Sequence, residues 1–174
     1  VIPLCDEVTD LARGIGAVNT LFWKNASGTG SSESISQEDK ILVGHNTDYE
    51  GFLYAASRAG IDFESKGVLI LGTGGTSLMA RRAAADQNAA KIYIASRHPE
   101  TDPPSGSEIQ DAGILSTVSY DQLPEIADSI DVIVNTTPVG TFPNNMQQVI
   151  RLKDFPGCQA VIDVIYNPFK TALL

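Results

Sequence analysis

The sequence has 174 residues, which is the length of one domain or of one domain plus a fragment. Its net charge of −9 argues against a nucleic-acid-binding protein and against a helix that lies on anionic lipid, because both normally need basic residues. The hydrophobic fraction of 43% and the charged fraction of 19% are typical of a globular chain. No apolar run approaches the ~20 residues of a membrane span. We therefore expect no nucleic acid and no membrane among the partners.

Cysteine and histidine spacing predicts neither a disulfide framework nor a metal site. The two cysteines, Cys5 and Cys158, lie near opposite ends of the sequence. No C-x-x-C or H-x-x-x-H pattern occurs, so we expect no bound metal. No secretory signal opens the sequence, and free cysteines suit a reducing compartment, which predicts a cytoplasmic protein.

The apolar pattern of the first residues predicts a helix. Leu4, Val8, Leu11 and Ile15 recur at gaps of four, three and four, which would place them on one helix face. The glycines at positions 14 and 16 would end this helix.

A hairpin and a second helix are expected next. Residues 17–23 and 41–43 are strand candidates, and the Ser- and Gly-rich residues 25–40 between them read as a long polar loop. Residues 48–59 carry apolar side chains at helical spacing and are followed by Gly60, a natural C-terminal stop.

From residue 61 onward, strands alternate with helices. The strand candidates are residues 67–71, 91–95, 114–118, 131–135 and 160–164, and a helix is expected over 75–88. Residues 99–106 read as a loop that we expect to be mobile. Short, wholly apolar strands such as 67–71 are typical of a parallel sheet covered on both faces. The alternation predicts an α/β fold with a doubly wound, mostly parallel sheet.

A glycine-rich turn joins the first of these strands to the following helix. Its residues are Gly72, Thr73, Gly74, Gly75 and Thr76, followed by Ser77 where the G-x-G-x-x-G pattern has its third glycine. Gly72 permits a tight turn, and Gly74 lets the backbone approach a pyrophosphate at the helix N-terminus. In a βαβ setting this turn predicts a Rossmann-like dinucleotide site, although a plain glycine-rich turn is the alternative.

The end of the next strand favours NADP over NAD. An NAD site needs an acidic residue there for the ribose 2′-hydroxyl, but this strand ends in Ser96, Arg97 and His98. A guanidinium binds a 2′-phosphate in bidentate fashion, and Ser96 adds a hydroxyl donor. The alternative for Arg97 is a solvated surface arginine.

Polar residues follow other strands as well. Thr136, Thr137 and Val139 come after the strand at 131–135, where they would line the nicotinamide half of a dinucleotide site. Asn19 and Asp48 lie at element ends in the first third of the sequence. Asp48 either caps the helix that it begins or lies in a cleft as a substrate ligand, in which case Thr47 would be the cap.

Six motifs together resemble the shikimate dehydrogenase family. They are Gly16-Ala-Val-Asn-Thr-Leu21, Gly44-His-Asn-Thr-Asp-Tyr-Glu-Gly51, Leu71-Gly-Thr-Gly-Gly-Thr-Ser77, Ser96-Arg97, Val134-Asn-Thr-Thr-Pro-Val-Gly140 and Asp163-Val-Ile-Tyr-Asn-Pro168. The resemblance runs through nearly the whole sequence, in order. It implies an NADP-dependent oxidoreductase that interconverts 3-dehydroshikimate and shikimate in aromatic amino-acid biosynthesis. Residues 1–60 would be the remnant of a substrate domain plus a connecting helix, and residues 61–174 the NADP domain.

The resemblance also implies roles for single residues. Asn19 and Asp48 would bind substrate hydroxyls, Asp48 as the candidate catalytic residue, and Tyr166 would face the small-molecule substrate. Gly72–Thr76 and Ser96–Thr101 would contact the phosphates of NADP. Val164 and Asp10 would border the cofactor.

The sequence also departs from the family. In the family, the motifs with the catalytic lysine and the serine pair lie before the part that corresponds to Val1. The closing glycine–glutamine motif of the family lies after the part that corresponds to Leu174. We therefore expect a family sequence that is incomplete at both ends. Made alone, such a polypeptide is expected to bind NADP weakly, to show no turnover and to self-associate.

Two alternative functions stay open. Glu100 or Asp102 near Arg97 leaves room for a quinate/shikimate dehydrogenase with mixed NAD and NADP use. A non-catalytic NADP-binding module is the second alternative.

Overall fold

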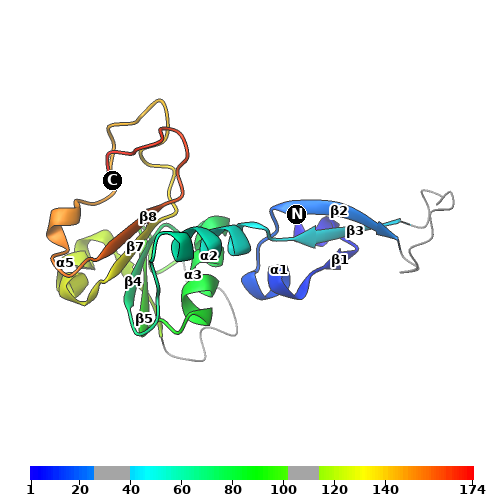
Figure 1. The fold of residues 1–174 in the computed structure, drawn as a ribbon, viewed down its shortest axis with the longest axis horizontal. Coiled ribbons are helices and arrows are strands. Elements are labelled where there is room, and N and C mark those ends of the chain that lie inside the picture. The colour runs from blue at the N-terminus through cyan, green and yellow to red at the C-terminus, as the bar shows by residue number, and fades with distance from the viewer. Residues whose placement is uncertain (26–39, 102–113) are drawn as a thin grey trace.

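A computed structural model describes residues 1–25, 40–101 and 114–174. It contains a three-stranded sheet, in the order β1-β3-β2, and a five-stranded sheet, in the order β6-β5-β4-β7-β8. Figure 1 shows the three-stranded sheet at one end of the chain's long axis and the five-stranded sheet toward the other. Most of the predicted loop over 25–40, and the part of the 99–106 loop from residue 102 onward, lie outside the described residues.

The single helix predicted from Leu4 to Ile15 is wrong. The structure has a short 3-10 helix η1 (Ile2–Leu4), a strand β1 (Glu7–Val8) and a six-residue helix α1 (Asp10–Ile15). Val8 pairs with Gly44 of β3 in parallel, and the Thr9 hydroxyl then accepts a hydrogen bond from Ala12 N and caps α1. Gly16 ends α1 with a φ of 78°, a conformation that glycine adopts without strain.

The predicted hairpin is confirmed. Strand β2 (Thr20–Asn25) pairs with β3 (Lys40–His45) in antiparallel register, from Thr20 opposite His45 to Asn25 opposite Lys40. This sheet and the short helix η1 before it leave large apolar side chains exposed, namely Leu4, Leu21, Phe22 and Trp23. An apolar surface of this kind favours association, as the sequence had suggested. Ile15, by contrast, is buried in the main core.

The five strands of the larger sheet are all parallel. They are β4 (Gly67–Leu71), β5 (Lys91–Ser96), β6 (Leu115–Ser119), β7 (Val132–Asn135) and β8 (Ala160–Asp163). Strand β4 is central and pairs with β5 on one edge and β7 on the other. This is the predicted doubly wound arrangement.

Helices cover both faces of this sheet because side chains alternate along each strand. On one face, Val68 and Ile70 of β4 pack in a core with α2 (Asp48–Arg58) and α3 (Gly75–Asp86). On the other, Leu69 and Leu71 pack with the short helix α5 (Leu123–Ile126) and its 3-10 neighbours η3 (Tyr120–Gln122) and η4 (Ala127–Ser129). A further 3-10 turn, η5 (Leu152–Asp154), precedes β8. Figure 1 shows α2 and α3 on the side of the sheet that faces the small one.

A polar contact joins the helices between the two sheets. The Tyr49 hydroxyl of α2 donates a 2.6 Å hydrogen bond to Asp86 of α3, and Arg82 Nε donates to both carboxylate oxygens of Asp86 at 2.8 and 2.9 Å. Burial and the Asp86 carboxylate raise the pKa of Tyr49 to about 12. A Cβ on Gly14 of α1 would lie 2.9 Å from a guanidinium nitrogen of Arg82, so α1 also approaches α3 closely here.

Alanine substitutions at two glycines, one in β4 and one in α2, should change the stability of the fold in opposite directions. A Cβ at Gly67, the first residue of β4, would collide with the backbone carbonyl oxygen of Ser129, whereas one at Gly51 of α2 would meet no atom within 4 Å. Gly67→Ala should lower the free energy of unfolding by about 1–3 kcal/mol. Gly51→Ala should raise it by up to about 1 kcal/mol, since alanine favours a helix. Urea unfolding followed by circular dichroism measures both; a neutral Gly67→Ala would contradict the packing at β4.

Candidate functional site

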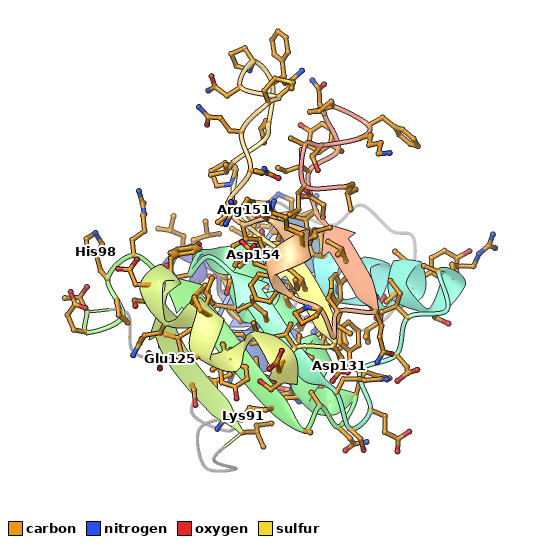
Figure 2. The ribbon with its side chains drawn as sticks, turned by 90° about the vertical axis from the view of Figure 1, so that its left-hand side faces the viewer. Lys91, His98, Glu125, Asp131, Arg151 and Asp154 are labelled. Carbon is orange, nitrogen blue, oxygen red and sulfur yellow. The ribbon has the colours of Figure 1, made fainter. Side chains whose placement is uncertain are left out.

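The carboxyl ends of the parallel strands share one edge of the large sheet. Figure 2 shows Lys91 at the start of β5 and Asp131 just before β7 on the lower side, and His98, which follows β5, higher up. At the end of β4 the chain turns at Gly72, whose φ of 101° suits glycine. A Cβ there would lie 3.0 Å from Thr137 Cγ2 and 3.2 Å from Thr136 Oγ1. The turn after β4 is therefore packed directly against the turn after β7.

The N-terminus of α3 is open toward this edge. Its N-cap residue Gly74 provides no side-chain hydrogen bond, and no acidic residue occupies the first turn. A Cβ at Gly74 would meet no atom within 4 Å, so a ligand can reach the backbone there. Ser77 is fully buried, as expected for the small residue that replaces the third glycine. Free N–H groups and the positive end of the helix dipole make such a terminus suitable for a phosphate.

The residues after β5 supply a cation. Ser96 is buried, and its hydroxyl oxygen accepts a 2.9 Å hydrogen bond from His98 N. Arg97 is exposed and makes no hydrogen bond or ion pair with the residues that the structure describes. Burial raises the pKa of the neighbouring Tyr120 phenol, and the positive charge of Arg97 opposes that rise. A guanidinium held free beside a cleft is available for an anionic group of a ligand.

Hydrogen bonds fix the turn after β7. Thr136 donates to the Leu71 carbonyl twice, from its backbone N at 3.0 Å and from Oγ1 at 2.6 Å. Asn135 Oδ1 accepts from Thr137 N at 3.1 Å and from Thr137 Oγ1 at 2.7 Å. Thr137 and the following residues are thus a rigid wall beside the glycine turn.

Together these segments enclose a cavity of about 540 Å³, here called the glycine-turn cavity. Its lining consists of Gly72, Thr73, Gly74, Ala95, Ser96, Arg97, His98, Tyr120, Thr136, Thr137, Pro138, Val139 and Val149. Eight of the eleven predicted cofactor-binding residues lie in this lining. The other three, Gly75, Thr76 and Val164, do not. Five residues of the lining were not predicted: Ala95, His98, Tyr120, Pro138 and Val149. Tyr120 follows β6 directly at its carboxyl end, and Val149 comes from an irregular segment without a motif.

A larger hollow of about 830 Å³ adjoins this cavity and shares Tyr120 and Val149 with it. It lies between α5 and the segment around η5. No glycine turn opens into it, and its arginine, Arg151, is paired with Asp154 at 3.0 Å. Figure 2 shows these two side chains above the short helices. The larger hollow therefore lacks the features that suit a phosphate.

Asn19 and Asp48 are brought next to each other through Thr47. Asn19 Oδ1 accepts hydrogen bonds from Thr47 N at 3.0 Å and from Thr20 Oγ1 at 2.9 Å. Thr47, one of the two candidates from the sequence, is the N-cap residue of α2, but its side chain makes no capping hydrogen bond. The side-chain oxygen that accepts from the first turn is instead Asn46 Oδ1, which receives a hydrogen bond from Tyr49 N at 3.2 Å. Asp48 is exposed, and its carboxylate has no hydrogen-bond partner among the described residues.

The remaining candidates lie apart from these two. Tyr166 is 93% exposed on the segment after β8 and has no described hydrogen bond to Asn19 or Asp48. Asp10 is exposed in the first turn of α1. His45 Nδ1 lies 2.9 Å from Thr9 Oγ1 and is occupied by that contact.

The described residues provide neither a metal cluster nor a membrane-spanning helix. No group of three or more His, Cys, Asp or Glu side chains there is arranged to hold a metal ion. No helix in the described part of the chain is long and apolar enough to cross a membrane.

The fold and this cavity together define the class of protein to which the chain corresponds. A doubly wound parallel sheet, with an uncapped helix and a glycine turn at the carboxyl end of its central strand, is the architecture of Rossmann-type dinucleotide-binding proteins. The arrangement fits a dinucleotide, because Gly74 leaves its backbone open and Arg97 is free to contact an anionic group.

Comparisons with known proteins narrow the class. No protein-family model matches the chain. A shikimate dehydrogenase (NADP(+)) from Moorella thermoacetica is 32% identical over the whole chain, which covers 56% of that protein. The crystal structure of shikimate 5-dehydrogenase from Thermus thermophilus in complex with NADP(H) and shikimate has a TM-score of 0.72 at 26% identity, over 99% of this chain and 57% of that one. A quinate dehydrogenase from Corynebacterium glutamicum in complex with NAD has a TM-score of 0.77 at 25% identity, over 100% of this chain and 58% of that one.

The resemblance expected from the sequence is therefore confirmed. The chain is similar to shikimate dehydrogenases along its whole length, and it spans about half the length of the curated proteins that it matches.

Alanine substitutions at Gly74 and Gly72 of the turn should have different effects, the first on ligand binding and the second on stability. Gly74→Ala should leave the free energy of unfolding within about 0.5 kcal/mol of the unmodified chain, because a Cβ there meets no atom. It should nevertheless weaken binding of a dinucleotide about tenfold or more, since the methyl group fills the space that a phosphate needs. Gly72→Ala should instead destabilise the fold by about 1–3 kcal/mol, because φ is 101° and two threonine side chains are close. Thermal unfolding and calorimetric titration measure the pair; equal binding by Gly74→Ala and the unmodified chain would exclude this site.

Proposed function

We propose that this chain carries the cofactor site and part of the substrate site of an NADP-dependent oxidoreductase that interconverts 3-dehydroshikimate and shikimate, a step of aromatic amino-acid biosynthesis. The observation that carries the proposal is the glycine-turn cavity, which combines an uncapped α3 N-terminus with a free Arg97. The division into a substrate-domain remnant over residues 1–60 and an NADP-binding domain over 61–174 is part of this proposal. We place the activity in the cytoplasm, and the free thiols of Cys5 and Cys158 support this.

Each wall of the cavity has a role in this proposal. The N–H groups at the start of α3 hold the pyrophosphate, and Gly74 allows its approach. Arg97 and Ser96 hold the ribose 2′-phosphate, which NADP has and NAD lacks. Thr137 and Val139 line the nicotinamide half. NADPH, when bound, supplies the hydride for reduction of a carbonyl; the protein supplies orientation.

Asn19 and Asp48 bind the substrate in this proposal. Asn19 keeps an amide nitrogen available, because its oxygen is the atom that Thr47 and Thr20 occupy. The Asp48 carboxylate is exposed at the start of α2 and free to accept a hydrogen bond from a substrate hydroxyl. The family resemblance implies that it also orients a lysine ammonium, which protonates the developing alkoxide. Tyr166, exposed after β8, is available to close over the substrate.

A second candidate function is a quinate/shikimate dehydrogenase that uses both NAD and NADP. The likeness to the quinate dehydrogenase structure favours it, as does Glu100, an exposed acid three residues after Arg97. Rates measured with each cofactor and with each acid, in a protein that contains the complete family sequence, distinguish the two functions.

Replacing Arg97 should discriminate between the two cofactors. Arg97→Ala should weaken NADP binding by about 1.5–3 kcal/mol, the range for hydrogen bonds to charged groups, and leave NAD binding nearly unchanged. Titration calorimetry measures both affinities. Arg58→Ala, an exposed arginine at the end of α2, is the control for loss of one positive charge. Equal losses for NADP and NAD would exclude the 2′-phosphate contact.

Replacing Asp48 tests the substrate site in a protein that contains the complete family sequence. Asp48→Asn should keep the fold and the NADP affinity but lower kcat/KM for the 3-dehydro acid. The loss should correspond to about 2–4 kcal/mol of transition-state stabilisation. Glu50→Gln is the matched control, since it removes the other acidic charge from the first turn of α2. Unchanged kinetics of Asp48→Asn would leave Asp48 with a role in the helix only.

A further inference from the structure

A partly buried polar network lies directly behind the Thr137 wall of the glycine-turn cavity. Asn135, the last residue of β7, is fully buried, and its Nδ2 donates a 3.1 Å hydrogen bond to Asp163 Oδ1. Its Oδ1 accepts from the backbone N and the hydroxyl of Thr137. The Asn135 side chain thereby transmits the position of Asp163 to Thr137.

Asp163 also holds the segment that follows β8. Its Oδ1 accepts a hydrogen bond from Ile165 N at 3.1 Å, and its Oδ2 accepts from Thr171 Oγ1 at 2.7 Å. Thr171 is only 5% exposed. Asp163 is partly buried, and burial of a carboxylate is costly unless donors surround it. Three donors from three parts of the chain meet this need here.

A backbone hydrogen bond and a close approach at Gly140 join the segments after β7 and β8 further from the sheet. Phe142 N donates to the Asn167 carbonyl at 3.1 Å. Gly140, with a φ of 100°, leaves room for its neighbours, because a Cβ there would lie 3.7 Å from Thr171 Cβ and 3.1 Å from the Gln147 carbonyl oxygen. Figure 2 shows both segments rising from the carboxyl edge of the sheet. Asp163 links the two segments next to the sheet, and the backbone hydrogen bond from Phe142 to Asn167 links them further away.

We propose that Asp163 is a positioning residue, which fixes the nicotinamide-side wall at Thr137 relative to the segment that carries Tyr166. Thr171 is the anchor that completes its hydrogen bonding. This inference rests on the proposed function, because it assumes that the cavity holds NADP(H) with the nicotinamide half at Thr137. Neither Asp163 nor Thr171 lines the cavity, so both act through other residues.

The variant Thr171→Val tests the proposal, because it keeps the shape of the side chain and removes the donor to Asp163. Two ligands are titrated into a protein that contains the complete family sequence. They are NADPH and adenosine 2′,5′-bisphosphate, which lacks the nicotinamide half that the proposal places at Thr137. The dissociation constant of NADPH should rise about fivefold to tenfold, which is less than the loss of a direct hydrogen bond to a charged group would cause, because Thr171 acts only through Asp163 and Thr137. That of adenosine 2′,5′-bisphosphate should change less than twofold.

Two further variants separate positioning from general damage. Thr171→Ser keeps the hydroxyl and should bind NADPH within twofold of the unmodified chain. Thr141→Val lies in the neighbouring segment, and no described side-chain hydrogen bond involves Thr141, so this variant should bind both ligands normally. A Ser variant as weak as the Val variant would overturn the proposal.

The two ligands also separate this inference from the function on which it rests. If Thr171→Val weakened the binding of both ligands equally, or left both unchanged, the role proposed for Asp163 would be overturned but the proposed function would not. Failure of the unmodified protein with the complete family sequence to bind either ligand would overturn the proposed function, and this inference with it.

Discussion

Pairing of the central strand β4 on both of its edges sets the position of three cavity walls, namely the turns that follow β4, β5 and β7. The register aligns Leu71 with Ala95 of β5 and with Asn135 of β7. All three strands therefore end at the same height, and the turns that follow them meet. The Leu71 carbonyl makes the closest link, because Thr136 donates to it through both backbone and side chain. A one-residue slip of β7 would place Thr137 on the wrong side of its strand.

The candidate substrate residues depend on a different set of contacts. Asn46 is almost fully buried and bridges two segments: its Nδ2 donates to the Ala17 carbonyl at 3.1 Å, and its Oδ1 caps α2. This fixes the start of α2 against the residues before β2, where Asn19 accepts a hydrogen bond from Thr47 N, next to Asp48 in the sequence. The Tyr49–Asp86 hydrogen bond then ties the same end of α2 to α3, whose N-terminus lines the glycine-turn cavity. The two candidate sites are thus connected through two helices.

How much could be predicted from the sequence depended on the range of the interactions involved. Strand β4 and its glycine turn were evident, because a buried parallel strand must be apolar and a tight turn must contain glycine. The helix over Leu4–Ile15 failed because Val8 gains more from pairing with Gly44, 36 residues away, than from the local helical spacing. The sequence left open whether Asp48 or Thr47 caps α2. Thr47 is the N-cap residue, but its hydroxyl lies 3.1 Å from Thr20 Oγ1 of another segment, and the side-chain capping hydrogen bond comes from Asn46. Tyr120 could have been found by applying the carboxyl-end rule to the weaker strand β6. Val149 could not, because no local pattern marks its segment.

The long sequence separation between the walls of the glycine-turn cavity has a consequence for folding. Leu71 and Thr136, which hold the walls together, are 65 residues apart in the sequence. Contacts of this kind close large loops, and their entropic cost makes them slow to form. A chain in which β4 and β5 have paired but β7 has not yet docked has a glycine turn and no opposite wall. A ligand of this cavity therefore recognises only the finished sheet, and its binding energy stabilises the native state over every partly assembled one.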